Sequence, residues 1–343
     1  MIFTSTSLVA STAVFVFAAL LICLVGTRIT TLADQLADRS GIGEALMGGV
    51  LLGAITSMSG SVLSVTAAWN GHPELAVSNA IGGMAAQLAF LAVADLCYRN
   101  ANLEHAAAST ENMLQGTVLL CLLSVLLVAI YSPQWKIFHI HPGTVLLLLG
   151  YAYGIRLVQQ GKHSPMWKPT DTKDTREDVR EKGNMKLSMW RLWTEFAVMA
   201  LLLALLGWQL QIAAVNISLG SGISHALMGG VLTAITTSLP ELVTSIAAVR
   251  RGALTLAVSG IIGGNAYDSL FVAFSDIAYL PGSIYHTVSD RLVFWIAVNC
   301  LMTSILLLGL LFRERRGIGG IGFESALTLL VYLAAATLLV SGG

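Results

Sequence analysis

The chain has 343 residues, of which 55% are hydrophobic and only 11% charged, and its formal net charge is zero. Ordinary soluble domains do not have this composition, whereas polytopic membrane proteins do. The zero net charge gives no basis for nucleic-acid binding. The four cysteines are scattered in apolar runs, which is typical of small buried hydrophobes and not of disulfides or metal ligands.

Ten apolar segments of roughly the 20-residue length needed to cross a bilayer follow one another along the chain. The first five are predicted at 8–27, 43–69, 75–98, 113–131 and 143–158, and the second five at 191–212, 223–249, 255–280, 291–311 and 322–340. No basic region precedes the first apolar run, so we expect a spanning helix there and not a cleaved signal peptide.

A polar stretch, 159–190, separates the two sets of five segments and mixes Lys and Arg with Asp and Glu. We interpret it as a solvated linker in preference to a regulatory element. The sequence therefore divides into a first repeat (1–158), this linker, and a second repeat (191–343).

The basic residues are distributed unevenly over the loops. If the N-terminus is outside, all 19 Lys and Arg except Lys136 and Arg291 lie on the inner side or in the linker. Cytoplasmic loops carry this excess. The prediction is a multi-pass protein of the cell membrane (inner or plasma), with both termini outside and the linker in the cytoplasm.

The two sets of segments are copies of one unit. Ala45–Val50 recurs unchanged as Ala226–Val231, and the match continues at the same offset as far as the end of the third segment. Because five spans per unit is an odd number, the second copy enters the membrane from the opposite side. The fold class predicted is all-α, with ten transmembrane helices in two inverted five-helix repeats. Secondary transporters are built in this way, with their site at the midplane.

The second copy carries two carboxylates within apolar sequence. Pro240 removes a backbone donor and breaks the helix, which places Glu241 in the first turn of its second half. Gly260, Gly264 and Asp268 recur every four residues on one helix face, where the glycines allow close packing that brings Asp268 toward the break. A charge at this depth costs on the order of 2.5–3.5 kcal/mol, which indicates a binding role.

Other oxygens surround the predicted break. The carbonyls near Ala234 and Thr237, left unwound, and the hydroxyls of Thr237 and Ser238 are candidate cation ligands. Oxygen ligands with two carboxylates suit a hard cation such as Ca²⁺, Mg²⁺, Mn²⁺ or Na⁺. We therefore expect metal binding at Glu241 and Asp268.

The first copy keeps the hydroxyls of Thr56-Ser-Met-Ser-Gly60 but has no carboxylate. Gly60 stands at the position of Glu241, and Gly60 is expected to weaken its helix less than a proline would. Gly83 and Gln87 stand at the positions of Gly264 and Asp268. The small Gly60 is expected to leave room for water or a larger cation.

At these residues the sequence resembles the alpha repeats of the calcium/cation antiporter superfamily, which includes sodium/calcium and proton/calcium exchangers. The second copy is similar to the signatures Thr-Ser-x-Pro-Glu and Gly-Ser-Asn-x-x-Asp. The resemblance implies that the second, third, seventh and eighth segments form the ion-binding core, across which the first and sixth slide. It implies acidic ligands at Glu241 and Asp268, and further ligands at Ala234, Thr237, Ser238, Gly53, Thr56, Ser57 and Gln87.

Two departures from the family pattern stand out: the first-repeat Glu is Gly60, and the serine of Gly-Ser is replaced by Gly83 and Gly264. Affinity for Ca²⁺ follows the number of charged ligands. We predict a secondary antiporter that exchanges Ca²⁺ or another divalent cation for Na⁺ or H⁺ by alternating access. No enzyme activity and no cofactor are expected, and the partners are membrane lipids and inorganic cations.

Two alternatives stay open. One is a carrier on the same scaffold for a different solute, such as an organic cation or a metabolite. The other is a membrane sensor or partner protein that does not transport.

Overall fold

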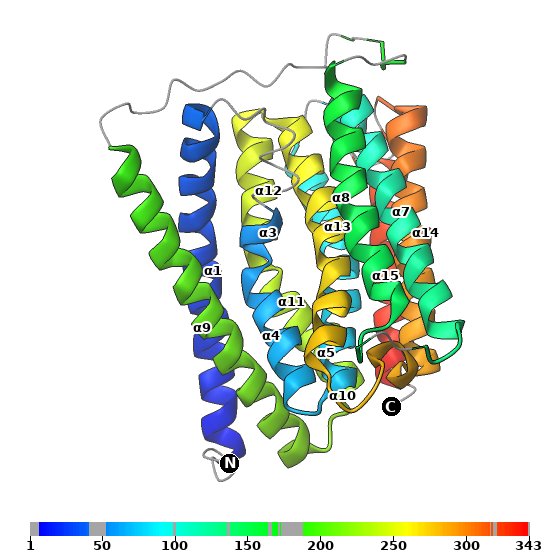
Figure 1. The fold of residues 1–343 in the computed structure, drawn as a ribbon. Helices are drawn as coiled ribbons and strands as arrows, with labels where there is room; N and C mark the ends of the chain where they lie inside the picture. The colour runs from blue at the N-terminus through cyan, green and yellow to red at the C-terminus, as the bar shows by residue number, and fades with distance from the viewer. Residues whose placement is uncertain are drawn as a thin grey trace.

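The computed structural model describes residues 7–40, 53–98, 101–135, 138–163, 167–170, 172, 188–315, 317 and 321–341, and every element among them is a helix. Figure 1 shows them as a bundle of long helices. The elements before the linker are α1 (Leu8–Ser40), α3 (Gly53–Thr56), α4 (Met58–Trp69), α5 (Pro73–Leu96), α6 (Leu103–Ala107), α7 (Thr110–Tyr131) and α8 (Pro142–His163). The elements after it are α9 (Met189–Ser221), α10 (His225–Leu227), the π-helix η2 (Met228–Thr233), α11 (Ala234–Thr237), α12 (Leu239–Arg251), α13 (Leu254–Ala278), the 3-10 helix η3 (Ile284–Thr287), α14 (Asp290–Phe312) and α15 (Phe323–Ser341).

Seven stretches of the described residues are long and apolar enough to cross a membrane: Leu8–Ile29, Pro73–Leu96, Thr110–Tyr131, Met189–Ser221, His225–Arg250, Leu254–Ala278 and Asp290–Phe312. The predicted spans 43–69, 143–158 and 322–340 are not among them. Residues 41–52 lie outside the described part, α8 ends in polar sequence, and the apolar part of α15, Phe323–Leu339, is shorter. The chain is thus an all-helical, multi-pass membrane protein.

The helices α5 and α13 form the centre of the bundle. Within the apolar windows of these two helices, 89% and 83% of the residues are buried, against 17% in α1. Pro73 at the first turn of α5 fits this start, because proline lacks only a donor that the first turn does not use. The central position of α5 and α13 explains why polar residues on them, including Gln87 and Asp268, are shielded from lipid.

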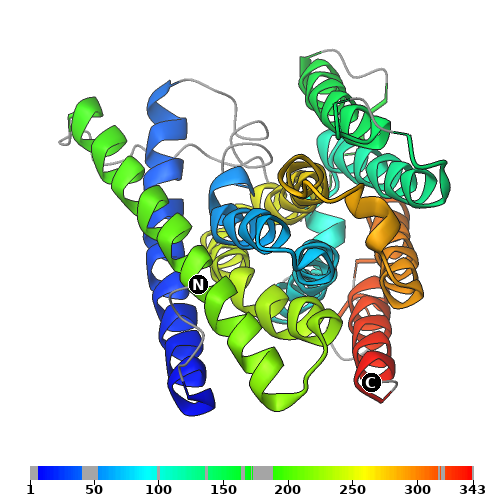
Figure 2. The same ribbon diagram turned by 60° about the horizontal axis from the view of Figure 1, so that its bottom comes forward.

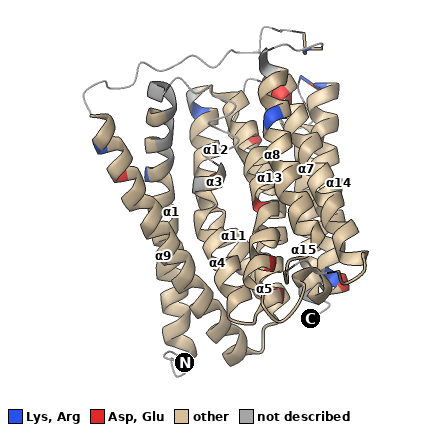
Figure 3. Ribbon diagram, viewed as in Figure 1, with Lys and Arg blue, Asp and Glu red and all other residues tan. Residues whose placement is uncertain are grey.

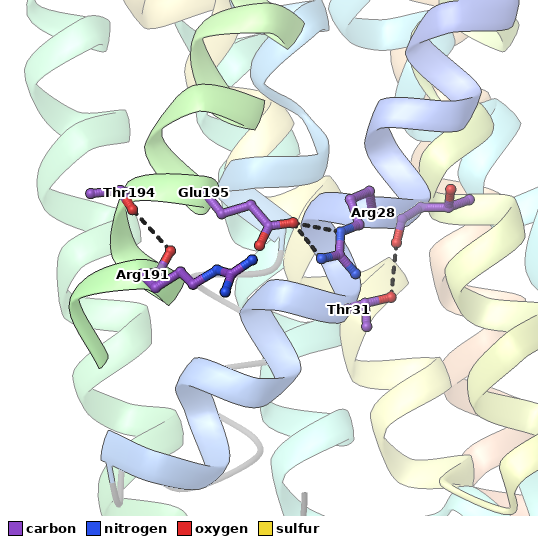
Figure 4. Close-up of polar contacts among 6 residues, drawn as sticks. Arg28, Thr31, Arg191, Thr194 and Glu195 are labelled. Atoms are coloured by element: carbon purple, nitrogen blue, oxygen red, sulfur yellow. Dashed lines mark hydrogen bonds and ion pairs between the residues drawn. The ribbon is translucent and has the colours of Figure 1, made fainter. Parts of the chain in front are cut away.

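The helices α1 and α9 lie together at the side of the bundle, where they cross at an angle (Figures 1 and 2). Each has 33 residues, so α1 continues past its predicted end at residue 27. In the second half of α1, Nε of Arg28 donates a hydrogen bond of 2.8 Å to Oε1 of Glu195, which ties the two helices together (Figure 4).

Two buried aspartates, Asp95 near the end of α5 and Asp276 near the end of α13, occupy matching positions of the two copies. The region around each is called a corner of its copy. Asp95 accepts from the backbone N–H groups of Leu103 (2.7 Å) and Gly322 (3.0 Å). Asp276 accepts from those of Ile284 (3.0 Å) and His141 (2.8 Å). Each carboxylate thus fixes a short helix to the start of a long one, which is a structural role.

The bundle has two ends, and the described residues nearest the chain termini and those flanking the linker lie at opposite ones. In Figure 1 the first described turn of α1 and the last of α15 lie at the lower end, and the end of α8 and the start of α9 lie at the upper end. Most of the described Lys and Arg lie toward this upper end in Figure 3. Much of the predicted linker 159–190 falls outside the described residues.

Candidate functional site

Two interrupted helices face each other across the bundle centre. One interruption falls at Ser57, between α3 and α4, and the other at Ser238, between α11 and α12. The two serines occupy matching positions of the repeat, so both copies break at the same place. Pro240 lies in the first turn of α12, as the sequence predicted, whereas the first copy breaks without a proline.

Glu241 and Asp268 are both buried, with exposed fractions of 3% and 2%. Oγ of Ser57 donates to Oε1 of Glu241 over 3.1 Å, and the hydroxyl of Thr56 interacts with the same carboxyl group. Ser57 also interacts with Asp268. The first copy therefore brings the hydroxyls of Thr56 and Ser57 to the carboxylates of the second.

Gln87 completes the cluster from α5. Its Nε2 donates to Oδ2 of Asp268 over 2.6 Å and to Oγ of Ser238 over 3.4 Å. Gly83, one turn earlier, opens onto the same space, since a Cβ there would lie 3.6 Å from Oγ of Ser238 and 3.7 Å from Oδ2 of Asp268. Residues far apart in the chain thus meet at one point.

Three buried oxygens of this cluster have no hydrogen-bond partner among the described residues: Oε2 of Glu241, Oδ1 of Asp268 and Oε1 of Gln87. An unsatisfied buried acceptor costs about 1–3 kcal/mol, and more when it is charged. A bound water or ion is one of the established explanations for such groups in native proteins. All three are acceptors, which is the chemistry that a cation requires.

The cluster has two acidic members only. Among the described residues, no group of three or more His, Cys, Asp or Glu side chains has the arrangement of a metal site. Neither Glu241 nor Asp268 forms an ion pair with a basic residue of the described part. The two carboxylates therefore face each other's charge without a protein cation to balance it.

The hydroxyl of Thr237 is buried beside the break but donates to the carbonyl of Thr233, over 2.9 Å, at the end of the preceding element η2. The expectation of an unwound carbonyl at Ala234 is wrong. Residues Ala234–Thr237 form a helical turn, and the carbonyl of Ala234 accepts from N–H of Ser238 over 3.2 Å. Gly53 begins α3 at the equivalent position.

The space beside Gly60 is filled, contrary to expectation. A Cβ at this position would lie 2.9 Å from Cε2 of Phe271 and 3.5 Å from Oγ1 of Thr237. The ring of Phe271 itself is 2% exposed. The position of the missing carboxylate therefore faces an aromatic ring, which sequence reasoning did not find because no periodicity distinguishes Phe271 from a core residue.

Gly260 does not have the close-packing role predicted for it. No atom of another described element lies within 4 Å of the place that a Cβ would take at Gly260. Gly264 is buried within α13. The tight approach occurs instead between α5 and η2, where a Cβ on Gly82 would overlap the carbonyl oxygen of Gly230.

Comparisons with known proteins agree with this architecture. The profile of the sodium/calcium exchanger protein family matches residues 10–158 and 184–341. A protein of Alkalimonas amylolytica named as antiporter CaxA is 28% identical over 90% of this chain and 92% of its own length. The inner membrane protein YrbG of Escherichia coli K12 is 25% identical over 80% of this chain and 81% of its own.

Solved structures of the sodium-calcium exchanger NCX_Mj have the same fold. One of them, soaked with 10 mM Na⁺ and no Ca²⁺, aligns with a TM-score of 0.64 at 18% identity, over 97% of this chain and 99% of its own.

Proposed function

This chain belongs to the sodium/calcium exchanger family of membrane cation antiporters, and from that premise we propose that it exchanges Ca²⁺, or another divalent cation, for Na⁺ or H⁺. The binding site of this proposal is the cluster around Glu241 and Asp268. Ser57, Thr56 and Gln87 from the first copy, and Ser238 and Thr237 from the second, contribute further oxygens.

The observation that carries the proposal is the set of three orphaned oxygens on Glu241, Asp268 and Gln87, all buried. A hard cation between them would take two carboxylate oxygens and one amide oxygen as ligands, which is the chemistry of Ca²⁺ sites. With the cation gone, the two buried carboxylates would lose their compensating charge. Their cost disfavours passage of an empty, ionised site.

The same cluster supports alternating access on a ten-helix scaffold of two inverted repeats. Both interrupted helices reach the cluster, and α1 and α9 lie outside it as a pair. In this proposal α1 and α9 slide over the breaks to expose the cluster to one side at a time. The excess of Lys and Arg near the linker supports a cytoplasmic linker and outside termini in the cell membrane.

The first experiment is a thermal-shift and flux panel on purified protein, with Ca²⁺, Mg²⁺, Mn²⁺ and Na⁺ each tested at several pH values. A cation that binds the folded state stabilises it, by about 2.7 kcal/mol at one hundred times its Kd. Glu241→Gln and Asp268→Asn are each expected to abolish both the shift and the flux while the protein stays folded. The matched control is Glu111→Gln, in the first turn of α7, outside the cluster. Full flux in either cluster variant would show that the site lies elsewhere.

A second candidate is a carrier for an organic cation on the same scaffold. The glycine at position 60, where the family pattern has a glutamate, favours it, because the site then carries one negative charge fewer and binds a divalent cation less tightly. A panel in which no inorganic cation gives a shift that depends on Glu241 and Asp268 would favour this candidate.

A further inference from the structure

A second group of buried carboxylates lies at the linker end of the bundle, away from the proposed transport site. Asp95 at the end of α5, Glu104 on the short helix α6 and Glu324 in the first turn of α15 have exposed fractions of 0%, 1% and 1%. They come from three separate elements, so their proximity results from the tertiary fold.

The three acids differ in what they bind. Both oxygens of Asp95 accept backbone N–H groups, from Leu103 and Gly322. Oε1 of Glu104 accepts from Oγ of Ser325, over 2.9 Å, and its Oε2 has no hydrogen-bond donor in the described part of the chain. The same part of the chain offers no donor to either oxygen of Glu324. The carboxyl groups of Glu104 and Glu324 lie within hydrogen-bonding reach of each other, and a bond between them requires that one carries a proton.

A small cavity adjoins Glu104. It has a volume of about 10 Å³ and is lined by Glu104, Ser325, Thr328 and apolar residues of α5 and α14. This is close to the minimum needed for one water molecule. A hydrated metal ion does not fit, and the three acids do not have the arrangement of a metal site among the described residues. A proton is the cation that this geometry accommodates.

The equivalent corner of the second copy has the same backbone contacts but different side chains. The equivalents of Glu104, Ser325 and Glu324 are Tyr285, Thr144 and Gly143. There the hydroxyls of Tyr285 and Thr144 hydrogen-bond over 2.8 Å, and Asp276 is the only acid of the corner's equivalent positions. The same corner is thus built without the two glutamates, so packing does not explain them.

The neighbouring charges on the described elements do not neutralise the pair. Glu314, just after α14, adds negative charge toward Glu324. Arg313 donates instead to the carbonyls of His105 and Thr170, over 3.1 and 2.6 Å. His105 bonds through one ring nitrogen to the carbonyl of Arg313, and Arg315 makes its own contacts at this end.

We propose that Glu104 and Glu324 form a proton-binding site that shares one proton and that reports the pH on the linker side to the transport site. Release of the proton leaves two adjacent charges, which push α6 away from α15. The motion acts on α5, because Asp95 holds both of these elements and lies about 12 Å along the same helix from Gln87. It also acts on the linker, since His105 contacts Thr172 and Arg313 contacts Thr170.

Protonation of Glu104 also makes the stability of the folded protein depend on pH. Burial, and then the charges of Asp95 and Glu324, raise the pKa of Glu104 well above its usual value. The protonated form is thus favoured in the folded state. Its contribution to stability is complete below the pKa of the unfolded chain and is lost as the pH rises through the folded pKa.

The test uses a transport-silent background, Glu241→Gln with Asp268→Asn, so that it does not depend on the proposed transport site. Infrared difference spectra of the purified protein are recorded between neutral and alkaline pH. We expect a protonated-carboxyl carbonyl band that disappears at alkaline pH, is lost in Glu104→Gln with Glu324→Gln, and persists in the control Glu111→Gln. If Glu104→Gln with Glu324→Gln leaves the spectrum unchanged, the two carboxyl groups do not share a proton.

Three further measurements cover the remaining outcomes. The fall of Tm with rising pH is expected to flatten in Glu104→Gln, and an unchanged slope counts against the site. Titration of the transport-silent variant with Ca²⁺ or Na⁺ is expected to show no binding at Glu104 and Glu324. Binding that is lost on Glu324→Gln would show that the two glutamates bind a metal ion and not a proton. The third measurement is the flux of the transport-competent protein between neutral and alkaline pH. If Glu104→Gln does not alter this pH profile, the proton site does not regulate transport.

Discussion

Ser57 lies between Glu241 and Asp268 and interacts with both, so a residue of the first copy holds together the two acids of the second. The amide of Gln87 has a similar position, with its nitrogen on Asp268 and its oxygen free of donors. A carboxylate at residue 87 would have repelled Asp268. The amide instead gives the site a neutral oxygen ligand, which limits its charge to that of two acids.

The pair of Gly60 and Phe271 leads to a prediction at the same scale. Gly60→Ala places a Cβ 2.9 Å from a buried ring, so overpacking is expected to cost about 1–3 kcal/mol and lower Tm. Gly260→Ala is the matched control: it meets no atom within 4 Å and is expected to be neutral or to stabilise α13 by about 0.5–1 kcal/mol.

A smaller side chain at 271 tests the cause of this loss. Phe271→Leu removes the ring edge, so the double variant with Gly60→Ala is expected to recover part of the Tm. Strict additivity of the two losses would contradict direct contact between residues 60 and 271.

At the scale of the elements, the two copies pack on each other through equivalent glycines. A Cβ on Gly26 of α1 would overlap the ring of Pro240, and one on Gly207 of α9 would overlap the backbone oxygen of Ser59. Gly26 and Gly207 occupy matching positions of the repeat, as do Ser59 and Pro240. Each long peripheral helix thus approaches the interrupted helix of the other copy, next to its break.

Gly207→Ala is therefore expected to disturb the contact of α9 with α4. The atom in its way belongs to the backbone and cannot rotate aside, so we expect a loss of about 1–3 kcal/mol in stability and slower flux. Gly220→Ala on the same helix is the control, because its Cβ would make an ordinary contact of 3.4 Å with Leu8. Equal flux in the two variants would show that the close approach of α9 is not needed for transport.

At the scale of the whole molecule, the net charge of the proposed site decides the charge moved in each cycle. Two carboxylates without a basic partner are neutralised by one divalent cation, or by two Na⁺ or two H⁺. Because the loaded site is neutral in both cases, the exchange is expected to be electroneutral.

The charge moved per cycle is tested by measuring flux in proteoliposomes under an imposed potassium diffusion potential. We expect divalent-cation flux to be independent of the potential. Gly60→Glu combined with Phe271→Ala adds a third acid and the room for it, so its flux is expected to become voltage-dependent. Voltage-dependent flux in the unaltered protein would mean that a group outside the cluster carries charge.

The sequence by itself determined the class of the molecule and the duplication, and it led to the two acids of the proposed site. Long apolar runs, the recurrence of Ala45–Val50 as Ala226–Val231 and a proline before Glu241 are local signals, and local signals are readable along the chain. The family profile and the shared fold confirm the resemblance drawn from them.

The tertiary structure alone decided which side chains meet. It placed Phe271 against Gly60, left Gly260 without a close neighbour from another described element, and brought Glu104 of the first copy to Glu324 of the second. These results depend on how helices from the two copies approach each other. That approach is set by the packing of many side chains at once and has no signature in the periodicity of any single segment.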